Sequence, residues 1–422
     1  MTSTHEGLAA TARSAKIGIK SLRATARVGL TGALGALCAF AAIPALAQSE
    51  AHGGMHQAAK PIVSTTLPEK PAGAHWIWVT DLPHGEYNRA LLYDADTGGR
   101  LATLDLGFES PKLIIPSNPK SERLYIGSVY YSRAMHGDRT DLVEIYDRKT
   151  MSLVKEIPIP PKQIRGWPDP TLSNISEDEG YVYTQFFTPA SSVGITNVKA
   201  GVFGSEVQTS GCAHVFGAGD HRLFTLCGDG SLLAIRYDEA GKEVSRKRYP
   251  AFFDAGKDPI HGSGFRSGNV WYFASHRGEI HSVDVSGDEL KFLPTWSVAE
   301  VEGDKTWTPG AFRQSVAIHR QKGILYLAMR LSDFTPKGAG PDFQALDGTE
   351  VWSFDMKTHK RLGRFKTELP IAYLAVSQDD KPLVYATNMW NKKVDSYDAA
   401  TGTKVREFGT YLTFMQTLQP VD

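Results

Sequence analysis

The sequence is poor in cysteine and has no excess of charge of either sign. Three cysteines among 422 residues exclude a framework of many disulfides. Lys and Arg together number 46, as do Asp and Glu, and this balance gives no electrostatic preference for a polyanion such as nucleic acid. After residue 47 no apolar run is long enough to span a bilayer. These absences indicate a large globular protein.

The common signatures of catalytic sites are also missing. H-E-x-x-H, C-x-x-C, G-x-S-x-G, G-x-G-x-x-G and the P-loop do not occur anywhere in the sequence. His52 and His56 have an i,i+4 spacing, but they lie in a segment where we expect no helix. Other histidines are scattered, and spacing alone does not show whether any of them converge: His84, His136, His261, His276 and His281. We therefore predict no catalytic, cofactor-binding or metal-ligating residue on this chain.

A repeated turn signature is what the sequence does contain. An apolar residue and an Asp precede a Thr or Gly at Asp94, Asp147, Asp238, Asp284, Asp355 and Asp398, with a degenerate copy at Asn197. Such a side chain accepts backbone N–H groups and starts a tight hairpin. The spacing is that of propeller blades. It predicts an all-β, seven-bladed β-propeller of four-stranded antiparallel blades, in which the C-terminal strand 411–418 closes the ring.

The first 47 residues differ from all that follow. Four basic residues, from Lys16 to Arg27, precede an apolar run that ends in Ala45-Leu46-Ala47, a pattern typical of a signal peptide. We predict cleavage between Ala47 and Gln48 and export to a periplasm, with an uncleaved membrane anchor as the alternative. The chain then divides into a signal peptide (1–47), an extended N-terminal arm (48–70) and the propeller (71–422).

Cleavage would leave two cysteines, Cys212 and Cys227, in an oxidising compartment. Both lie in strand-like sequence, so we predict a disulfide that joins neighbouring strands. The alternative is two free buried thiols.

Tryptophans at strand positions, such as Trp271 and Trp352, are predicted to fill the core. Trp307 precedes Pro309-Gly310, and its position fits either a core residue or an anchor for a partner surface. The long interval that contains Trp307 also holds a Pro/Gly-rich stretch, 332–348, which we expect to form a loop on one face.

Several contiguous runs resemble the heavy chain of the periplasmic quinoprotein amine dehydrogenases, which oxidise methylamine or aromatic (aralkyl) amines. The runs occur in order along the mature chain: 132–144, 156–162, 191–195, 212–232, 278–281, 286–289 and 307–310. Pro160-Pro161-Lys162 and Cys227-Gly228-Asp229-Gly230 are closer to the aromatic amine branch than to the methylamine branch.

The resemblance implies a seven-bladed propeller that lacks the cofactor itself. Its partner would be a small, disulfide-rich light chain that bears tryptophan tryptophylquinone, in an assembly of two heavy and two light chains. The assembly would oxidise a primary amine, an aromatic one in preference to methylamine, to an aldehyde and ammonia. Electrons would pass to a blue copper protein of the amicyanin or azurin kind.

The family also suggests where substrate passes. In the methylamine enzymes a His-Phe pair after the first strand places a Phe on the substrate channel, whereas here His84 is followed by Gly85-Glu86-Tyr87. His84, Gly85 and Tyr87 are therefore candidates for the channel or the light-chain contact. An exposed loop tyrosine is an equally good interpretation of Tyr87.

Two other functions fit a propeller without catalytic motifs. A periplasmic binding scaffold would be a stable monomer that grips a protein or peptide with its loops. A hydrolase of the lactonase type would need acidic or His residues that converge on a metal in the central channel.

The cleavage site gives a first test. We expect the exported protein to begin at Gln48, and an Ala47→Tyr variant, which lacks the small residue at the cleavage site, to remain unprocessed. N-terminal sequencing of both proteins measures this. A membrane-bound product that retains residues 1–47 would instead establish the anchor.

Overall fold

The computed structural model describes residues 66–81, 88–116, 118, 120–164, 170–302, 305–310, 314–332, 347–388, 392–409 and 415–421. All of them belong to one compact unit, Val63–Asp422. The predicted signal peptide, its cleavage site at Ala47 and Gln48, and the arm up to residue 65 lie outside the described residues.

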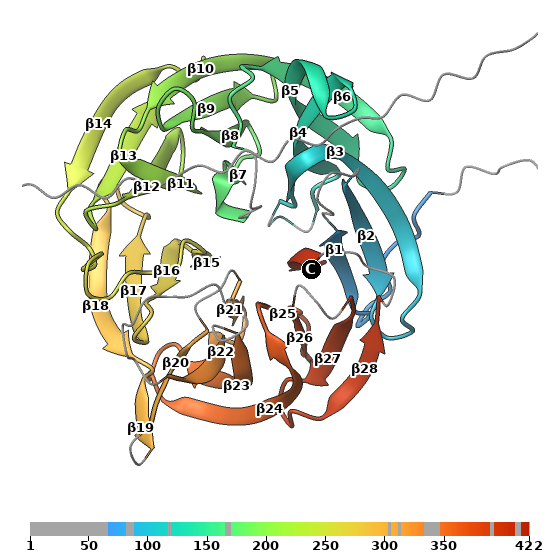
Figure 1. Cartoon of the computed structure of the whole chain (residues 1–422), viewed down its shortest axis with the longest axis vertical. Coiled ribbons are helices and arrows are strands. Elements are labelled where there is room, and N and C mark those ends of the chain that lie inside the picture. Colours follow the sequence, from blue (N-terminus) through green and yellow to red (C-terminus); the bar gives the residue numbers. More distant parts are fainter. Residues whose placement is uncertain are drawn as a thin grey trace, which may run out of the picture. The chain divides into compact units, whose positions relative to one another are not determined.

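The described chain is almost entirely antiparallel β-structure. Apart from one short 3-10 helix, η1 (Pro170–Leu172), its regular elements are strands. Within these ranges no helix is long and apolar enough to cross a membrane. Figure 1 shows the sheets of this unit following one another around a common centre, with strands such as β7, β15 and β25 nearest to it and β14 and β24 at the periphery.

The first sheet has seven strands in the order β29-β1-β2-β3-β4-β5-β6. Their bounds are β29 (Met415–Pro420), β1 (Trp76–Asp81), β2 (Asn88–Asp94), β3 (Arg100–Ile114), β4 (Arg123–Arg133), β5 (His136–Asp147) and β6 (Leu153–Ile159). Residues 100–107 of the long β3 pair with β2, and residues 112–114 pair with β4. Gly107, at φ +78°, lies where β3 passes from one partner to the other, a conformation that favours glycine. One strand therefore joins two four-stranded groups.

Three four-stranded sheets follow along the chain. The first contains β7 (Ser173–Ile175), β8 (Tyr181–Phe186), β9 (Ser192–Asn197) and β10 (Val202–Gln208). The second contains β11 (Cys212–Gly217), β12 (Arg222–Cys227), β13 (Leu232–Tyr237) and β14 (Glu243–Tyr249). The third contains β15 (Phe265–Ser267), β16 (Val270–Ala274), β17 (Glu279–Asp284) and β18 (Lys291–Ser297).

The last two sheets contain six and four strands. The six-stranded sheet contains β19 (Glu300–Glu302), β20 (Lys305–Pro309), β21 (Val316–His319), β22 (Ile324–Ser332), β23 (Gly348–Asp355) and β24 (Arg361–Ile371). β21 pairs with the first half of β22 and β20 with the second half, so β19 and β20 add a hairpin to a four-stranded group. In Figure 1 the β19 end of this hairpin projects outward from the ring of sheets. The final sheet contains β25 (Tyr373–Val376), β26 (Leu383–Thr387), β27 (Val394–Asp398) and β28 (Lys404–Phe408).

The hairpin signature behaves as the sequence predicts. Oδ1 of Asp147 accepts the N–H groups of Lys149 and Thr150 at 3.0 and 2.9 Å. Asp355 and Asp398 accept N–H groups two and three residues on in the same way, and Oδ1 of Asn197 accepts that of Ala200 at 2.8 Å. Because these bonds favour the charged carboxylate, the pKa of Asp355 is lowered, chiefly by the Thr358 N–H.

The core consists of apolar clusters that lie between successive sheets. Phe216 and Phe224 of one sheet pack on Trp271 and Phe273 of the next, with the Phe216 and Trp271 centroids 5.0 Å apart. Across the first and last sheets, Tyr93 packs on Phe408 at 5.5 Å. Each sheet therefore buries its faces against its neighbours. The result is an all-β fold of antiparallel sheets, consistent with a β-propeller.

A polar contact also joins the first and last sheets. His75 lies just before β1, and its Nδ1 contacts Asp96 at 2.7 Å while its Nε2 contacts Asp379, in the β25–β26 turn, at 3.2 Å. Burial alone would lower the pKa of His75, but the hydrogen bond that its ring donates to Asp96 and the negative charges of Asp379 and Asp96 outweigh burial and raise it. The imidazolium form therefore stabilises this contact.

We expect the His75→Ala variant to lose about 1 to 3 kcal/mol of unfolding free energy at pH 6, the value of a charged hydrogen bond. Since the folded-state pKa is raised above the ordinary 6.5, the contribution is complete below that value and is lost as pH rises through the folded-state pKa. Urea unfolding of both proteins from pH 5.5 to 8.5 would measure the difference, with the exposed His136→Ala as control. A difference that stays constant with pH would contradict the argument.

Candidate functional site

The turns of the sheets define two faces of the described unit. The Asp turns lie at the same ends of the sheets as the turns between the two innermost strands. This is seen from side chains that connect a turn of one kind in one sheet to a turn of the other kind in the next sheet. His75 joins Asp96 of the first kind to Asp379 of the second, and Arg222 donates to the carbonyl oxygen of Gly287 at 2.6 Å. We call these ends the hairpin face. The opposite ends, which carry the connections from second to third strands and from sheet to sheet, are the loop face.

The strands that flank the predicted site residues have their ends on the loop face. His84, Gly85 and Tyr87 lie in the β1–β2 connection, outside the described residues. The stretch 332–348 is the β22–β23 connection, and of it 333–346 lie outside the described residues. The described ends of both connections, at Asp81 and Asn88 and at Ser332 and Gly348, lie on the same face of the sheets.

Both ends of the β1–β2 connection are fixed by polar contacts. Arg89, which follows the connection, forms an ion pair at 2.8 Å with Asp81, which precedes it and whose side chain is fully buried. The side-chain amide of Asn88 donates to the Gly107 carbonyl at 3.1 Å. A buried carboxylate is costly unless it is paired, so this contact holds the two ends of the connection together.

The β22–β23 connection ends in a tightly packed region. A Cβ on Gly348 would lie 2.7 Å from that of Ala328, so any larger residue requires a shift. Further along β23, the Glu350 carboxylate accepts a hydrogen bond from the Trp352 indole N–H at 2.8 Å. Trp307 packs on Trp352 with ring centroids 5.2 Å apart and is only 6% exposed. Of the two interpretations of Trp307, the structure supports the core residue.

Buried carboxylates near the loop face are occupied by internal partners. Glu144 accepts hydrogen bonds from the hydroxyls of Ser128 and of Tyr130, the latter at 2.9 Å. Burial raises the pKa of Glu144, and the two hydroxyl donors only partly oppose it. Asp141 is held by Arg139 at 2.6 Å. These groups stabilise β4 and β5 and line none of the cavities described below.

The predicted disulfide is confirmed, and it lies beside a cavity on the loop face. Cys212 and Cys227 are directly opposite each other on β11 and β12. The cavity of about 400 Å³ is lined largely by apolar groups, among them Phe187, Phe253 and the disulfide itself. His214 lines it too, and its Nδ1 contacts the Thr171 hydroxyl at 2.6 Å.

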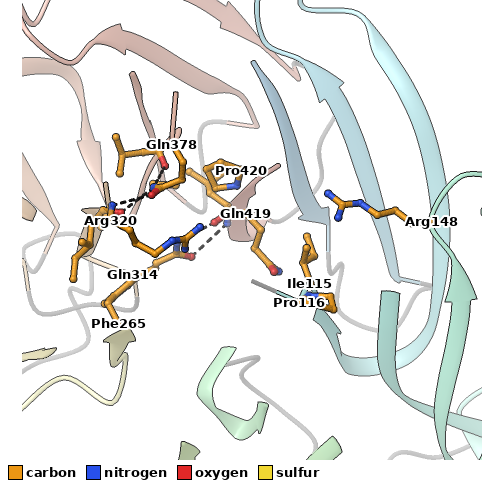
Figure 2. Close-up of a pocket in the computed structure, with 14 residues that line it drawn as sticks. Ile115, Pro116, Arg148, Phe265, Gln314, Arg320, Gln378, Gln419 and Pro420 are labelled. Atoms are coloured by element: carbon orange, nitrogen blue, oxygen red, sulfur yellow. Dashed lines mark hydrogen bonds between the residues drawn. The ribbon is translucent and has the colours of Figure 1, made fainter. Parts of the chain in front are cut away.

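A second cavity, of about 220 Å³, lies near the centre of the ring of sheets (Figure 2). Gln314 donates there to the carbonyl oxygens of Leu374 and Leu418 at 3.0 and 2.9 Å, and so ties the innermost strands β25 and β29 together. Arg320 and Arg148 line opposite sides of this cavity in Figure 2. Burial lowers the pKa of both guanidinium groups.

The structure brings together two of the scattered histidines. The rings of His261 and His276 stack with centroids 4.5 Å apart, and burial lowers the pKa of His276. Sequence spacing gave no sign of this pair, because it is the antiparallel pairing of β15 with β16 that brings a residue before the first strand beside a residue after the second. No group of three or more His, Cys, Asp or Glu side chains able to hold a metal ion occurs among the described residues.

Comparison with known proteins shows the family to which this chain belongs. A family model described as methylamine dehydrogenase heavy chain matches residues 120–417, more than half of the chain. The chain belongs to this family. The resemblance seen in the sequence is thereby confirmed, and the chain is an amine dehydrogenase heavy subunit by homology.

Individual relatives agree with the family model. The methylamine dehydrogenase heavy chain of Methylorubrum extorquens is 27% identical over 390 residues, which cover 88% of this chain and 90% of the relative. That of Methylophilus methylotrophus is 28% identical over 312 residues, which cover 73% and 74%. A solved structure of a functionally unknown protein from Desulfotomaculum acetoxidans is 10% identical, covers 81% of this chain and 98% of its own, and has a TM-score of 0.50, so it shares the fold alone.

The disulfide supplies a prediction. A double variant, Cys212→Ser with Cys227→Ser, should lose about 3 kcal/mol of unfolding free energy, because the bond closes a 15-residue loop in the unfolded chain. Urea unfolding of the variant and of the reduced and oxidised parent measures the loss. Identical stability of reduced and oxidised parent would refute the stabilising role of the bond.

Proposed function

We propose that this chain is the heavy subunit of a quinone-dependent amine dehydrogenase that oxidatively deaminates a primary amine to an aldehyde and ammonia. The main observation that supports the proposal is that the chain aligns with methylamine dehydrogenase heavy chains over most of their length, in one case over 90% of the relative. The match extends over 88% of this chain and 90% of that relative, so the likeness extends beyond one shared blade or motif.

The architecture we propose is a seven-bladed propeller closed by the C-terminal strand. Seven apolar clusters of the described residues each join one four-stranded group to the next. The pairing of β29 with β1, as in Val79 with Leu418, supports closure by a strand from the far end of the chain. The long strand β3 takes part in two neighbouring groups and joins them into one larger sheet, while the β19–β20 hairpin is added to a single group, so neither changes this count.

The active assembly in this proposal contains two heavy and two light chains. The quinone, tryptophan tryptophylquinone, and the catalytic base belong to the small disulfide-rich light chain. Electrons leave to a blue copper protein of the amicyanin or azurin kind. The signal peptide places the assembly in the periplasm after cleavage at Ala47.

The role of this chain is to hold the light chain and to form part of the wall of the substrate channel. We assign that role to the loop face, because both candidate connections leave from it. The Asp81–Arg89 ion pair and the Asn88 contact fix the described ends of the connection that contains His84, Gly85 and Tyr87. A fixed wall selects substrates by shape.

We favour an aromatic amine over methylamine as substrate. The Pro160-Pro161-Lys162 and Cys227-Gly228-Asp229-Gly230 runs support the aromatic branch, and the replacement of the His-Phe pair at His84-Gly85 supports a different channel wall. The alternative substrate is methylamine, after which the relatives are named.

Purification from the native periplasm tests the proposal. We expect a native mass of two heavy and two small chains and a visible quinone band that bleaches when a primary amine is added, with tyramine turned over more efficiently than methylamine. Native mass spectrometry, absorption spectroscopy and the two kcat/KM values measure these outcomes. A tertiary amine, which cannot form the same adduct, is the control. A colourless monomer without a companion chain would refute the proposal and favour the binding scaffold.

A further inference from the structure

A third cavity lies on the hairpin face, away from the loop face to which we assign the light chain. Its volume is about 280 Å³. The segment 67–70 forms one side, and Leu67 is attached there by its N–H to the Lys149 carbonyl at 2.7 Å. The other sides come from β1, β2, the turns after β3 and β5, and Val421. We call it the tryptophan cavity.

The floor of the tryptophan cavity is apolar and aromatic. Trp76 and Trp78 line it and pack into the core cluster; they are 6% and 1% exposed, so only a small part of each indole reaches the cavity. Leu92 and Val421 add aliphatic surface, and both belong with the two indoles to one core cluster. Met151 packs against the same cluster. A rigid floor of this kind suits a flat apolar group at low entropic cost.

Cationic side chains surround this floor. Lys70 and Arg148 are half-buried, whereas Lys120 and Lys149 are exposed at the rim. No carboxylate of the described residues lies within ion-pair distance of any of these four cations. The acidic side chains that line the cavity, Glu69 and Glu122, are both exposed. The inner charges are therefore positive.

Arg148 is the group with the most unused bonding capacity. Its guanidinium carries five N–H donors, but its hydrogen bond within the described chain is one long contact, 3.5 Å, to the Ser121 carbonyl. Arg148 also lines the central cavity of Figure 2, so it stands between the two cavities. Burial lowers the pKa of Arg148 and of Lys70, which indicates that water solvates neither cation fully. A planar fork of donors in such a place matches a carboxylate.

We propose that the tryptophan cavity binds an aromatic monocarboxylate, with its ring on the Trp76–Trp78 floor and its carboxylate against Arg148 and Lys70. The volume is slightly below the range of about 300 to 1,000 Å³ typical of small-molecule sites, so it suits a single ring rather than a nucleotide. The positive charges that line the cavity disfavour a protonated amine. The site is therefore distinct from the amine site of the proposed function and does not depend on it.

Calorimetric titration of the purified mature protein, with whatever subunits it retains, tests this site. The probes are phenylacetate, its neutral analogue phenylacetamide, and acetate. We expect saturable binding of phenylacetate with a Kd below about 1 mM, and affinities at least tenfold weaker for the other two, since one lacks the charge and the other the ring.

Two variants connect the binding to the named cations. Arg148→Gln should weaken phenylacetate binding at least about tenfold, and Lys70→Gln should weaken it in the same direction. Arg236→Gln, which removes an exposed arginine from another sheet, is the matched control and should bind as the parent does. Thermal unfolding of each variant verifies that it is folded.

Three results would overturn the proposal. The first is the absence of saturable phenylacetate binding to the parent protein. The second is equal affinity for phenylacetamide, which would show an apolar pocket without an anion site. The third is unchanged binding by folded Arg148→Gln and Lys70→Gln variants.

Discussion

Burial of both faces of every sheet is the constraint on which the rest of the structure depends. The middle strands of the sheets are apolar on both sides, as in β8, where all six residues are buried. Such a sheet is stable only when another sheet covers each face. Phe216 and Phe224 satisfy this by packing on Trp271 and Phe273, and Tyr93 does so by packing on Phe408. Each sheet needs two neighbours, and this requirement favours an arrangement of sheets around a centre.

Because the core lies between the sheets, the connections at the ends of the strands are less constrained by packing. The connections on one face can therefore differ from those on the other. The hairpin face is regular: short Asp turns are joined from sheet to sheet by contacts such as His75 with Asp379. The loop face carries the longer connections, and its polar groups, such as Asp81 and Glu144, are held by internal partners. A regular face and a variable face on one frame are suited to a subunit whose role is to position another chain.

The family membership and the structure bear on different parts of the function. The match to methylamine dehydrogenase heavy chains indicates an amine dehydrogenase subunit, while identities of 27 to 28% leave room for a different amine. On the hairpin face, the tryptophan cavity with its cationic lining is the site that we propose for a ligand of opposite charge. Its cations come from the segment before β1 and from the β5–β6 turn, so the site depends on how the first two groups of strands are joined through β3.

The sequence alone determined what depends on short-range chemistry. An Asp side chain bonds to N–H groups two or three residues away, so the turns at Asp147, Asp355 and Asp398 could be read directly and their spacing predicted the all-β repeat. The Cys212–Cys227 pair could be predicted because both cysteines lie in strand-like sequence and the third, Cys38, lies in the predicted signal peptide. The prediction for His84, Gly85 and Tyr87 rests on family resemblance, and those residues lie outside the described ranges.

Only the tertiary structure decided which distant side chains meet. Three examples are the burial of Trp307 against Trp352, the stacking of His261 on His276, and the lining of one cavity by both Arg148 and Trp76. Each joins residues from separate turns or strands. Local sequence carries no signal for such contacts, because they are set by the register of the strands and by the packing of one sheet against the next.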